Sequence, residues 1–255
     1  MTKPIATQSF ASRIALVTGV GRRQGIGAAI CRALAEHGAD VFFTYWHAYD
    51  GDLFPKDNQL DPRQFARDLE ASGVRAAFTE MDLSALDSAA TLFQEAERVL
   101  GRPTILINNA CYDIESPFVA LREQSLDQHY AINVRAVTML CKEFVKQGRP
   151  GSIINMTSGQ SLGPMGSDKI PYTITKASVE MLTKQLAPDL QPNGITINAL
   201  DPGPTDTGWM TDELKAQIVR ESKRGSVTVP ADIAALIVQM LCDARATGQV
   251  IHAVR

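Results

Sequence analysis

Tyr172 and Lys176 stand four residues apart just after a proline, and this spacing carries the clearest chemistry in the sequence. Pro171 suits the first turn of a helix, so both side chains are expected on one helical face, about one turn apart. A nearby ammonium stabilises a phenolate, so Lys176 is expected to lower the pKa of Tyr172 from its usual value of about 10. The phenol could then give or take a proton as a general acid or base.

Ser158 is the second residue with a chemical use. It follows a short apolar run, residues 152–156, that predicts a buried strand. Ligands bind open α/β sheets at the carboxyl ends of their strands, so Ser158 could hold a carbonyl or alcohol oxygen against the phenol of Tyr172. Taken alone, a Tyr and a Lys at this spacing more often form a solvated surface pair. Motifs elsewhere in the chain have to show whether this pair is catalytic or a solvated surface pair.

Composition sets the broad class of the protein. The 255 residues are 45% hydrophobic and 21% charged, which fits one large domain spanning residues 1–255. A net charge of -3 gives no reason to expect nucleic acid or a membrane surface as a partner. The sequence shows neither a membrane-spanning apolar run of about 20 residues nor the apolar core of a signal peptide, so a cytoplasmic protein is predicted. Its four cysteines and four histidines are scattered without a disulfide or metal-binding pattern.

A glycine-rich turn lies between the first predicted strand, residues 13–18, and a helix predicted over 28–37. Gly19, Gly25 and Gly27 would let the backbone approach a pyrophosphate, whose charge the helix N-terminus stabilises. Because the turn opens a strand–turn–helix unit, it predicts a dinucleotide cradle, with a tight turn that binds nothing as the weaker alternative.

Two arginines in this turn bear on the choice of cofactor. The second predicted strand, residues 40–45, ends at Tyr45 and Trp46, without the acidic residue that usually holds the ribose hydroxyls of NAD. Arg22 and Arg23 are expected near the position of a 2′-phosphate and would favour it over a free hydroxyl. NADP(H) is therefore predicted, and NAD(H) stays open because exposed arginines are common and the aromatic residues could simply flank an adenine.

Polar residues also follow later strands. Asp82 comes just after a strand predicted over 74–81, where it could accept a hydrogen bond from an adenine amino group or cap the next helix. Asn109 follows the fourth strand and can fix the backbone at the sheet edge. Asn133 stands inside a long helix predicted over 126–147. Asparagine has a low helix propensity, so its presence there needs a specific explanation.

The remaining segments complete the predicted architecture. Residues 48–61 are too poor in apolar residues for a regular element and read as a mobile rim beside the cofactor or a surface insertion. Further expected elements are helices over 62–72, 85–100 and 230–242, strands over 195–200 and 249–253, and a mobile, partly helical cover over 205–225. The alternation predicts an α/β fold: a Rossmann-like, doubly wound, mostly parallel seven-stranded sheet with helices on both faces.

These motifs together resemble the short-chain dehydrogenase/reductase family over nearly the whole chain. They are the glycine turn, Asn108-Asn109-Ala110, Asn133, Ser158, Tyr172-x-x-x-Lys176 and Asp201-Pro202-Gly203, in the family's order and approximate spacing. The resemblance implies that Tyr172 is the general acid/base and that Ser158 orients and polarises the carbonyl. It implies that Lys176 lowers the pKa of the tyrosine and holds the nicotinamide ribose, and that Asn133 positions a water in the proton relay.

The same resemblance implies a set of cofactor contacts and an assembly. Thr18, Gly19, Gly25, Ile26 and Gly27 would line the pyrophosphate, Asp82 the adenine, Asn109 the nearby ribose, and Pro202, Gly203 and Thr205 the nicotinamide side. Hydride would pass between C4 of the nicotinamide and the carbonyl carbon. A homo-tetramer or dimer, packed through the helices over 126–147 and 172–190, is also implied.

The chain departs from the family pattern at four places. Five residues separate Gly19 from Gly25 where the family usually has three, and this lengthening resembles the enoyl-reductase branch. Thirteen residues separate Ser158 from Tyr172, one more than usual, so Ser161 is kept as an outside candidate. Cys111 replaces the glycine that commonly follows Asn-Asn-Ala, and the C-terminus lacks the usual glycine pair.

The predicted function is an NADP(H)-dependent oxidoreductase that interconverts a ketone, with 3-oxoacyl groups among the candidates, and a secondary alcohol. An enoyl reductase is the nearest rival, but its tyrosine and lysine are normally separated by six residues, and the position seven before Lys176 is Lys169. A non-catalytic NADP-binding regulatory protein is the third reading, and such proteins tend to lose the catalytic residues that are all present here. The expected substrate lining is Cys111, Tyr112, Leu162, Met165, Trp209 and Met210.

Overall fold

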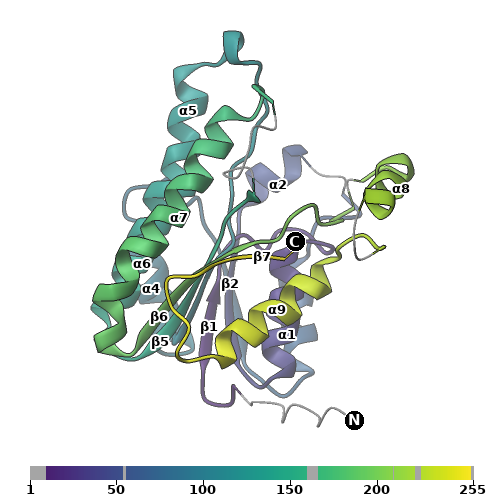
Figure 1. Cartoon of the computed structure of the whole chain (residues 1–255). Helices are drawn as coiled ribbons and strands as arrows, with labels where there is room; N and C mark the ends of the chain where they lie inside the picture. The colour runs from purple at the N-terminus through teal and green to yellow at the C-terminus, as the bar shows by residue number, and fades with distance from the viewer. Residues whose placement is uncertain (1–9, 54–55, 160–165, 209, 222–224, 254–255) are drawn as a thin grey trace.

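A parallel sheet forms the centre of the molecule (Figure 1). The computed structural model describes residues 10–53, 56–159, 166–208, 210–221 and 225–253. These described residues form seven strands in the order β3-β2-β1-β4-β5-β6-β7, and every neighbouring pair is parallel. The strands are β1 (Ile14–Val17), β2 (Asp40–Tyr45), β3 (Ala76–Glu80), β4 (Ile105–Asn108), β5 (Gly151–Met156), β6 (Ile195–Asp201) and β7 (Val250–His252). The predicted doubly wound sheet is confirmed, and it is parallel throughout.

Helices cover both faces of the sheet, which explains why the strands are apolar on both sides. The helices α1 (Ile26–Glu36), α3 (Pro62–Glu70) and α9 (Pro230–Cys242) share one core with strand residues such as Ala15 and Val17. The helices α4 (Ser88–Val99), α6 (Val137–Lys146) and α7 (Ile170–Leu190) share the other with Leu16. Successive strand residues therefore point to opposite layers, as the period of two requires.

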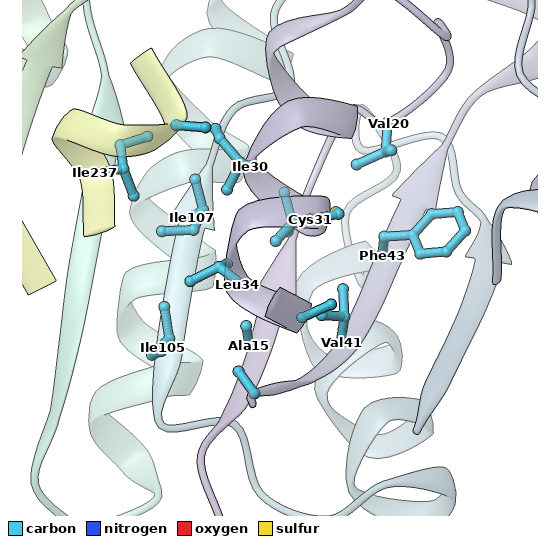
Figure 2. Packing of buried hydrophobic residues seen from close by; sticks show 14 of the residues in the cluster. Ala15, Val20, Ile30, Cys31, Leu34, Val41, Phe43, Ile105, Ile107 and Ile237 are labelled. Atoms are coloured by element: carbon cyan, nitrogen blue, oxygen red, sulfur yellow. The ribbon is translucent and has the colours of Figure 1, made fainter. Parts of the chain in front are cut away.

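The first of these two cores fixes the start of α1, and with it the glycine turn. Figure 2 shows Ile30 and Leu34 of α1 packed over Ile105 and Ile107 of β4, with Ile237 of α9 beside them. All five side chains are at most 1% exposed. Because α1 is buried along this face, its N-terminus stays fixed at the carboxyl edge of the sheet.

Two predicted segments differ from the structure. The helix α2 (His47–Leu53) begins directly after β2, within the stretch expected to lack a regular element. It is held by contacts distant in sequence, because Tyr49 packs against Tyr112 and its hydroxyl accepts from Asp113 N. The helix predicted over 126–147 is a continuous run of three parts, α5 (Glu123–Tyr130), a π-helical turn η2 (Ala131–Ala136) and α6. The predicted cover over 205–225 contains α8 (Asp212–Glu221).

Candidate active site

The candidate site lies at the carboxyl edge of the sheet, beside the point where strand order reverses. The chain runs from β1 outward to β2 and β3, and then returns to place β4 on the other side of β1. The loops that leave β1 and β4 therefore diverge there and form a crevice, which is where doubly wound sheets bind their ligands. In Figure 1 the helices α2 and α8 lie above this edge.

Ser158, Tyr172 and Lys176 are brought together at this edge. Ser158 follows β5, and the other two residues lie in the first turns of α7. A hydrogen bond joins the Ser158 and Tyr172 side chains. The buried Lys176 Nζ lies 5.7 Å from the centroid of the Tyr172 ring and donates at 2.8 Å to the carbonyl of Met156. A hydroxyl, a phenol and an ammonium are thus adjacent, as proton transfer to a bound oxygen requires.

The pKa of Tyr172 differs from the sequence-based expectation. Burial of its hydroxyl raises the pKa well above the ordinary value, and Cys111, Asp113 and Asp201 act in the same direction. Only the hydrogen bond from Ser158 opposes them among the main influences. The expected lowering by Lys176 does not dominate, because this ammonium lies over the ring face and is hydrogen-bonded to Met156. Tyr172 is therefore a protonated phenol at neutral pH.

The mid-helix Asn133 finds its partners in neighbouring loops. Its side chain is 1% exposed and lies in the π-helical turn. Its Oδ1 accepts from Tyr112 N at 2.8 Å, and its Nδ2 donates to Tyr112 O at 2.9 Å and to Thr175 Oγ1 at 3.1 Å. The residue ties the loop after β4 to α7, which is the reason for an asparagine at this position. The role of Asn133 in positioning a water for proton transfer stays a prediction.

The glycine turn is closed by hydrogen bonds from the loop after β4. Thr18 Oγ1 accepts from the backbone N–H groups of Asn109 and Ala110 at 3.1 and 3.0 Å. Asn109 Nδ2 donates to the carbonyls of Thr18 and Gly19, each at 2.9 Å. A Cβ on Gly19 would lie 2.5 Å from Ala110 Cα, and one on Gly27 would lie 2.7 Å from Asn109 Nδ2. Only glycine fits at both positions.

This turn has the features of a pyrophosphate cradle. Gly25 is the N-cap of α1 and offers no side chain to its first-turn N–H groups, and Ile26 begins the helix. Uncapped N–H groups at a helix N-terminus stabilise a phosphate by hydrogen bonding and by the helix dipole. The residues present therefore fit the dinucleotide that the sequence predicts.

The two arginines of the turn point to different partners. Arg22 Nη1 donates to Thr207 Oγ1 at 3.1 Å, in the loop that follows β6. Burial lowers the pKa of Arg22, and the nearby Asp50 opposes this. Arg23 Nε donates to the carbonyl of Gln59 at 3.1 Å. The sequence predicted both arginines at one phosphate; here Arg22 contacts the loop after β6 and Arg23 contacts the connection before α3, and their contact with a cofactor stays a prediction.

The remaining predicted cofactor residues make local hydrogen bonds. Asp82 Oδ1 accepts from Ser84 N at 2.8 Å, in the turn that leads to α4. Thr205 Oγ1 donates to the carbonyls of Pro202 and Gly203, both at 3.2 Å, and so closes the turn after β6. Their contacts with a cofactor stay predictions.

The described part of the substrate lining contains a thiol, a phenol and a thioether. Cys111 and Tyr112 lie in the loop after β4, and Met210 is buried. Burial raises the pKa of the Cys111 thiol, although Lys176 opposes this, so Cys111 is expected to pack without reacting. Ser161, Leu162, Met165 and Trp209 lie outside the described residues.

Sequence reasoning did not place Lys169 beside Tyr172 and missed the two acidic partners of Lys169. Lys169 Nζ lies 5.8 Å from the ring centroid of Tyr172 and forms ion pairs with Asp113 Oδ2 at 2.9 Å and Glu115 Oε1 at 2.8 Å. Lys169 precedes Tyr172 by three residues, a spacing that places neighbours on one helix face and could have indicated this contact. Nothing local in the sequence indicates the two carboxylates.

The described residues include neither a membrane-spanning helix nor a cluster of metal ligands. The helices there include none that is long and apolar enough to cross a membrane. The same residues contain no group of three or more His, Cys, Asp or Glu side chains that could hold a metal ion.

Known proteins are similar to this chain over nearly its whole length. A family model described as Enoyl-(Acyl carrier protein) reductase matches residues 19–253. The chain is 38% identical over 247 residues to the uncharacterized oxidoreductase YjdA of Bacillus subtilis, covering 94% of each chain. It is 30% identical to the 3-oxoacyl-[acyl-carrier-protein] reductase FabG of Staphylococcus epidermidis, covering 94% of this chain and 97% of that one. The solved structure of a blue fluorescent protein from a metagenomic library, in complex with NADPH, superposes with a TM-score of 0.84 at 28% identity, covering 96% and 97%.

Proposed function

The chain belongs to the short-chain dehydrogenase/reductase family of NAD(P)-dependent oxidoreductases, and we propose that it reduces a ketone to a secondary alcohol with NADPH. The observation that carries the proposal is the hydrogen bond between Ser158 and Tyr172 beside the ammonium of Lys176. These groups lie next to a glycine turn that fits a pyrophosphate.

Each of these side chains has a distinct task in the proposed reaction. The Ser158 hydroxyl donates a hydrogen bond to the carbonyl oxygen and holds it near the phenol. NADPH, when bound, supplies the hydride to the carbonyl carbon. Tyr172 donates its proton to the same oxygen, so the carbonyl gains one hydride and one proton and becomes an alcohol. Lys176 stabilises the phenolate that remains until solvent returns the proton.

Reduction is the proposed direction because of the state of the phenol. The raised pKa of Tyr172 keeps it protonated at neutral pH, so it is ready to act as the acid that reduction needs. Oxidation of an alcohol needs the phenolate as a base, and this form is scarce at neutral pH. The reverse reaction is therefore expected at higher pH.

NADP(H) is the proposed cofactor because the turn carries Arg22 and Arg23 and because β2 ends at Tyr45 without an acid. One contact favours NAD(H) instead. The carboxylate of Glu80, at the end of neighbouring β3, accepts from His47 N at 3.0 Å and places negative charge beside the end of β2. Such a charge could accept from ribose hydroxyls and repel a 2′-phosphate.

A fluorescence titration with NADPH and NADH decides between the two cofactors. Replacing both Arg22 and Arg23 with alanine should weaken NADPH binding at least about tenfold more than NADH binding, since each lost charge-assisted bond costs over 1 kcal/mol. Arg98→Ala, on the exposed face of α4, is the matched control. Equal losses for both cofactors would remove the case for phosphate recognition.

A substrate panel tests the reaction itself. Purified protein with NADPH is given simple ketones, 3-oxoacyl thioesters and enoyl thioesters, and loss of reduced-cofactor absorbance is followed. Turnover of a ketone or an oxoacyl compound is the expected result. Cofactor binding without turnover of any compound would favour the regulatory alternative.

Enoyl reduction is the second candidate because the matching family model carries that description and the glycine turn is long. The spacing of Tyr172 and Lys176 argues against it, since the position seven before Lys176 is Lys169, whose ammonium is paired with Asp113 and Glu115. Preferential turnover of the enoyl thioesters in the same panel would reverse this ranking.

A homo-oligomer packed through α5, α6 and α7 is also proposed. Tyr130 on α5 is 40% exposed, and Ile174 and Met181 on α7 are 39% and 54% exposed. Large apolar side chains exposed on adjacent helices are typical of an interface. Replacing Ile174 and Met181 with serine should shift the mass measured by light scattering towards the monomer.

A further inference from the structure

The connection between β2 and α3 makes hydrogen bonds with the enlarged glycine turn. Leu60 N donates to Gly21 O at 2.9 Å, and Arg23 N donates to Asn58 O at 2.8 Å. Arg22 and Gln59 form an isolated antiparallel bridge. Residues 58–60 thus lie along the turn as a short extra strand would. They support residues 21–23, which belong to the lengthened part of the turn.

The side chain of Asn58 extends this support to a second loop of the site. Its Oδ1 accepts from Gln24 N at 3.2 Å, in the glycine turn. Its Nδ2 donates to Thr207 O at 3.2 Å, in the loop that follows β6. The amide of Asn58 therefore joins two loops. Its partner Gln24 lies 34 residues before Asn58 in the sequence, and its partner Thr207 lies 149 residues after it.

The two loops meet at Gly208, whose positive φ favours glycine. Gly208 has a φ of +89°, and a Cβ there would lie 2.6 Å from Gln24 Oε1 and 3.3 Å from Asn58 Nδ2. Arg22 Nη1 adds a second link to Thr207, at 3.1 Å to Oγ1. The contact between the glycine turn and the loop after β6 is thus packed tightly around Asn58.

The same connection reaches the loop after β4 at its other end. Tyr49, in α2, accepts from Asp113 N at 3.1 Å through its hydroxyl. Its ring stacks on Trp46, with centroids 6.1 Å apart, and packs against Tyr112 at 5.4 Å. Residues 46–53 and 56–60 therefore contact the loops after β1, β4 and β6, which carry many of the predicted cofactor and substrate residues.

We propose that Asn58 is a positioning residue for the cofactor, which sets the glycine turn and the loop after β6 at the separation that the dinucleotide needs. This inference rests on the proposed function, with the pyrophosphate at the glycine turn, and on the nicotinamide contact at Pro202–Thr205 that the family resemblance implies. A longer loop loses more conformational entropy on ordering, so a lengthened turn gains more from a fixed support. Holding the turn in its binding conformation beforehand increases affinity.

Two variants of Asn58 separate its two hydrogen bonds. Asn58→Ala removes both, and we expect NADPH to bind about tenfold more weakly, as the loss of two bonds predicts. Asn58→Asp keeps an acceptor for Gln24 N but sets a carboxylate against the Thr207 carbonyl, so only the link to the loop after β6 is lost. Asn193→Ala, an exposed asparagine with one bond to its own helix end, is the matched control.

Hydrogen exchange supplies a readout that needs no cofactor. In Asn58→Ala, backbone amides over 20–26 and 203–208 should exchange faster, whereas in Asn58→Asp only those over 203–208 should do so. The melting temperature of each variant, measured alongside, separates this local effect from general loss of stability. Failure of the wild-type protein to bind either cofactor would overturn the proposed function and the cofactor role together.

The positioning role alone fails under two other results. One is wild-type NADPH affinity in Asn58→Ala, and the other is an equal loss of affinity in the Asn193→Ala control. Unchanged exchange over both segments in Asn58→Ala would show that the two loops are held without this side chain, and it would overturn the inference whatever the affinities are.

Discussion

Asn133 hydrogen-bonds both backbone polar groups of Tyr112, accepting from its N–H at 2.8 Å and donating to its carbonyl at 2.9 Å. The side-chain amide of Asn133 thus bonds the backbone N–H and C=O of one residue, as a neighbouring strand would. These two bonds fix the loop after β4 where that loop enters the candidate site. Asn133 lies in a π-helical turn, and π-turns of this kind are frequent at functional sites.

Asn133→Ala should therefore lower both stability and activity. It leaves the N–H and carbonyl of Tyr112 without these partners, and unpaired buried polar groups cost about 1–3 kcal/mol. Urea unfolding should show a free energy of unfolding lower by that amount, with kcat/KM for reduction also reduced. An unfolding curve identical to the wild type would contradict the positioning of the loop by Asn133.

Tyr172→Phe tests the proposed acid. The change removes one hydroxyl and keeps the ring between Lys169 and Lys176. Turnover of the preferred ketone should fall about 10²- to 10⁴-fold, the usual contribution of a general acid, while the Kd of NADPH stays near that of the wild type. Thr91→Val, which removes an exposed hydroxyl on α4, is the control. If Tyr172→Phe keeps the turnover of the wild type, the proposed mechanism is wrong.

The raised pKa of Tyr172 predicts opposite pH dependences for the two directions. Reduction needs the protonated phenol, and burial holds its pKa above the ordinary value. Its kcat/KM should stay level through neutral pH and fall only above about pH 10. Oxidation needs the phenolate, so its rate should rise with pH across the alkaline range. Initial rates in both directions over a buffer series check this, and a reduction rate that already halves on going from about pH 6 to pH 8 would contradict it.

The fold followed from sequence because its signals are local. Strands buried on both faces leave continuous apolar runs, and Pro230 marks the start of α9, whose predicted bounds match the structure. The helix α2 was missed because its support comes from Tyr112 and Asp113, which only the fold brings near Tyr49.

Within the site, residue types could be read from sequence, but their surroundings could not. The motif spacing identified Ser158, Tyr172 and Lys176, which the structure brings together. The direction of Arg22 depends on Thr207, 185 residues away, and the pKa of Tyr172 depends on burial and on distant acids. Such long-range effects have no local signature in the sequence.

The last strand contributes a histidine to the same edge. His252 Nδ1 lies 2.9 Å from Asp201 Oδ2, and Asp201 Oδ1 accepts from Gly203 N at 2.8 Å. A Cβ on Gly159, the residue after Ser158, would lie 2.6 Å from Asp201 Oδ2. Asp201 therefore contacts both the turn after β6 and the residue next to the proposed catalytic serine, and His252 fixes its position.

His252→Ala should leave the nearly buried Asp201 carboxylate without this partner and loosen both contacts. We expect kcat/KM for reduction to fall about tenfold, equivalent to about 1.4 kcal/mol, in the range of one hydrogen bond to a charged group. His252→Asn, whose amide can donate to the same oxygen, should recover much of the loss. His37→Ala, at the opposite end of α1 from the glycine turn, is the control. If His252→Asn is as impaired as His252→Ala, the effect comes from lost packing of the imidazole and not from its bond to Asp201.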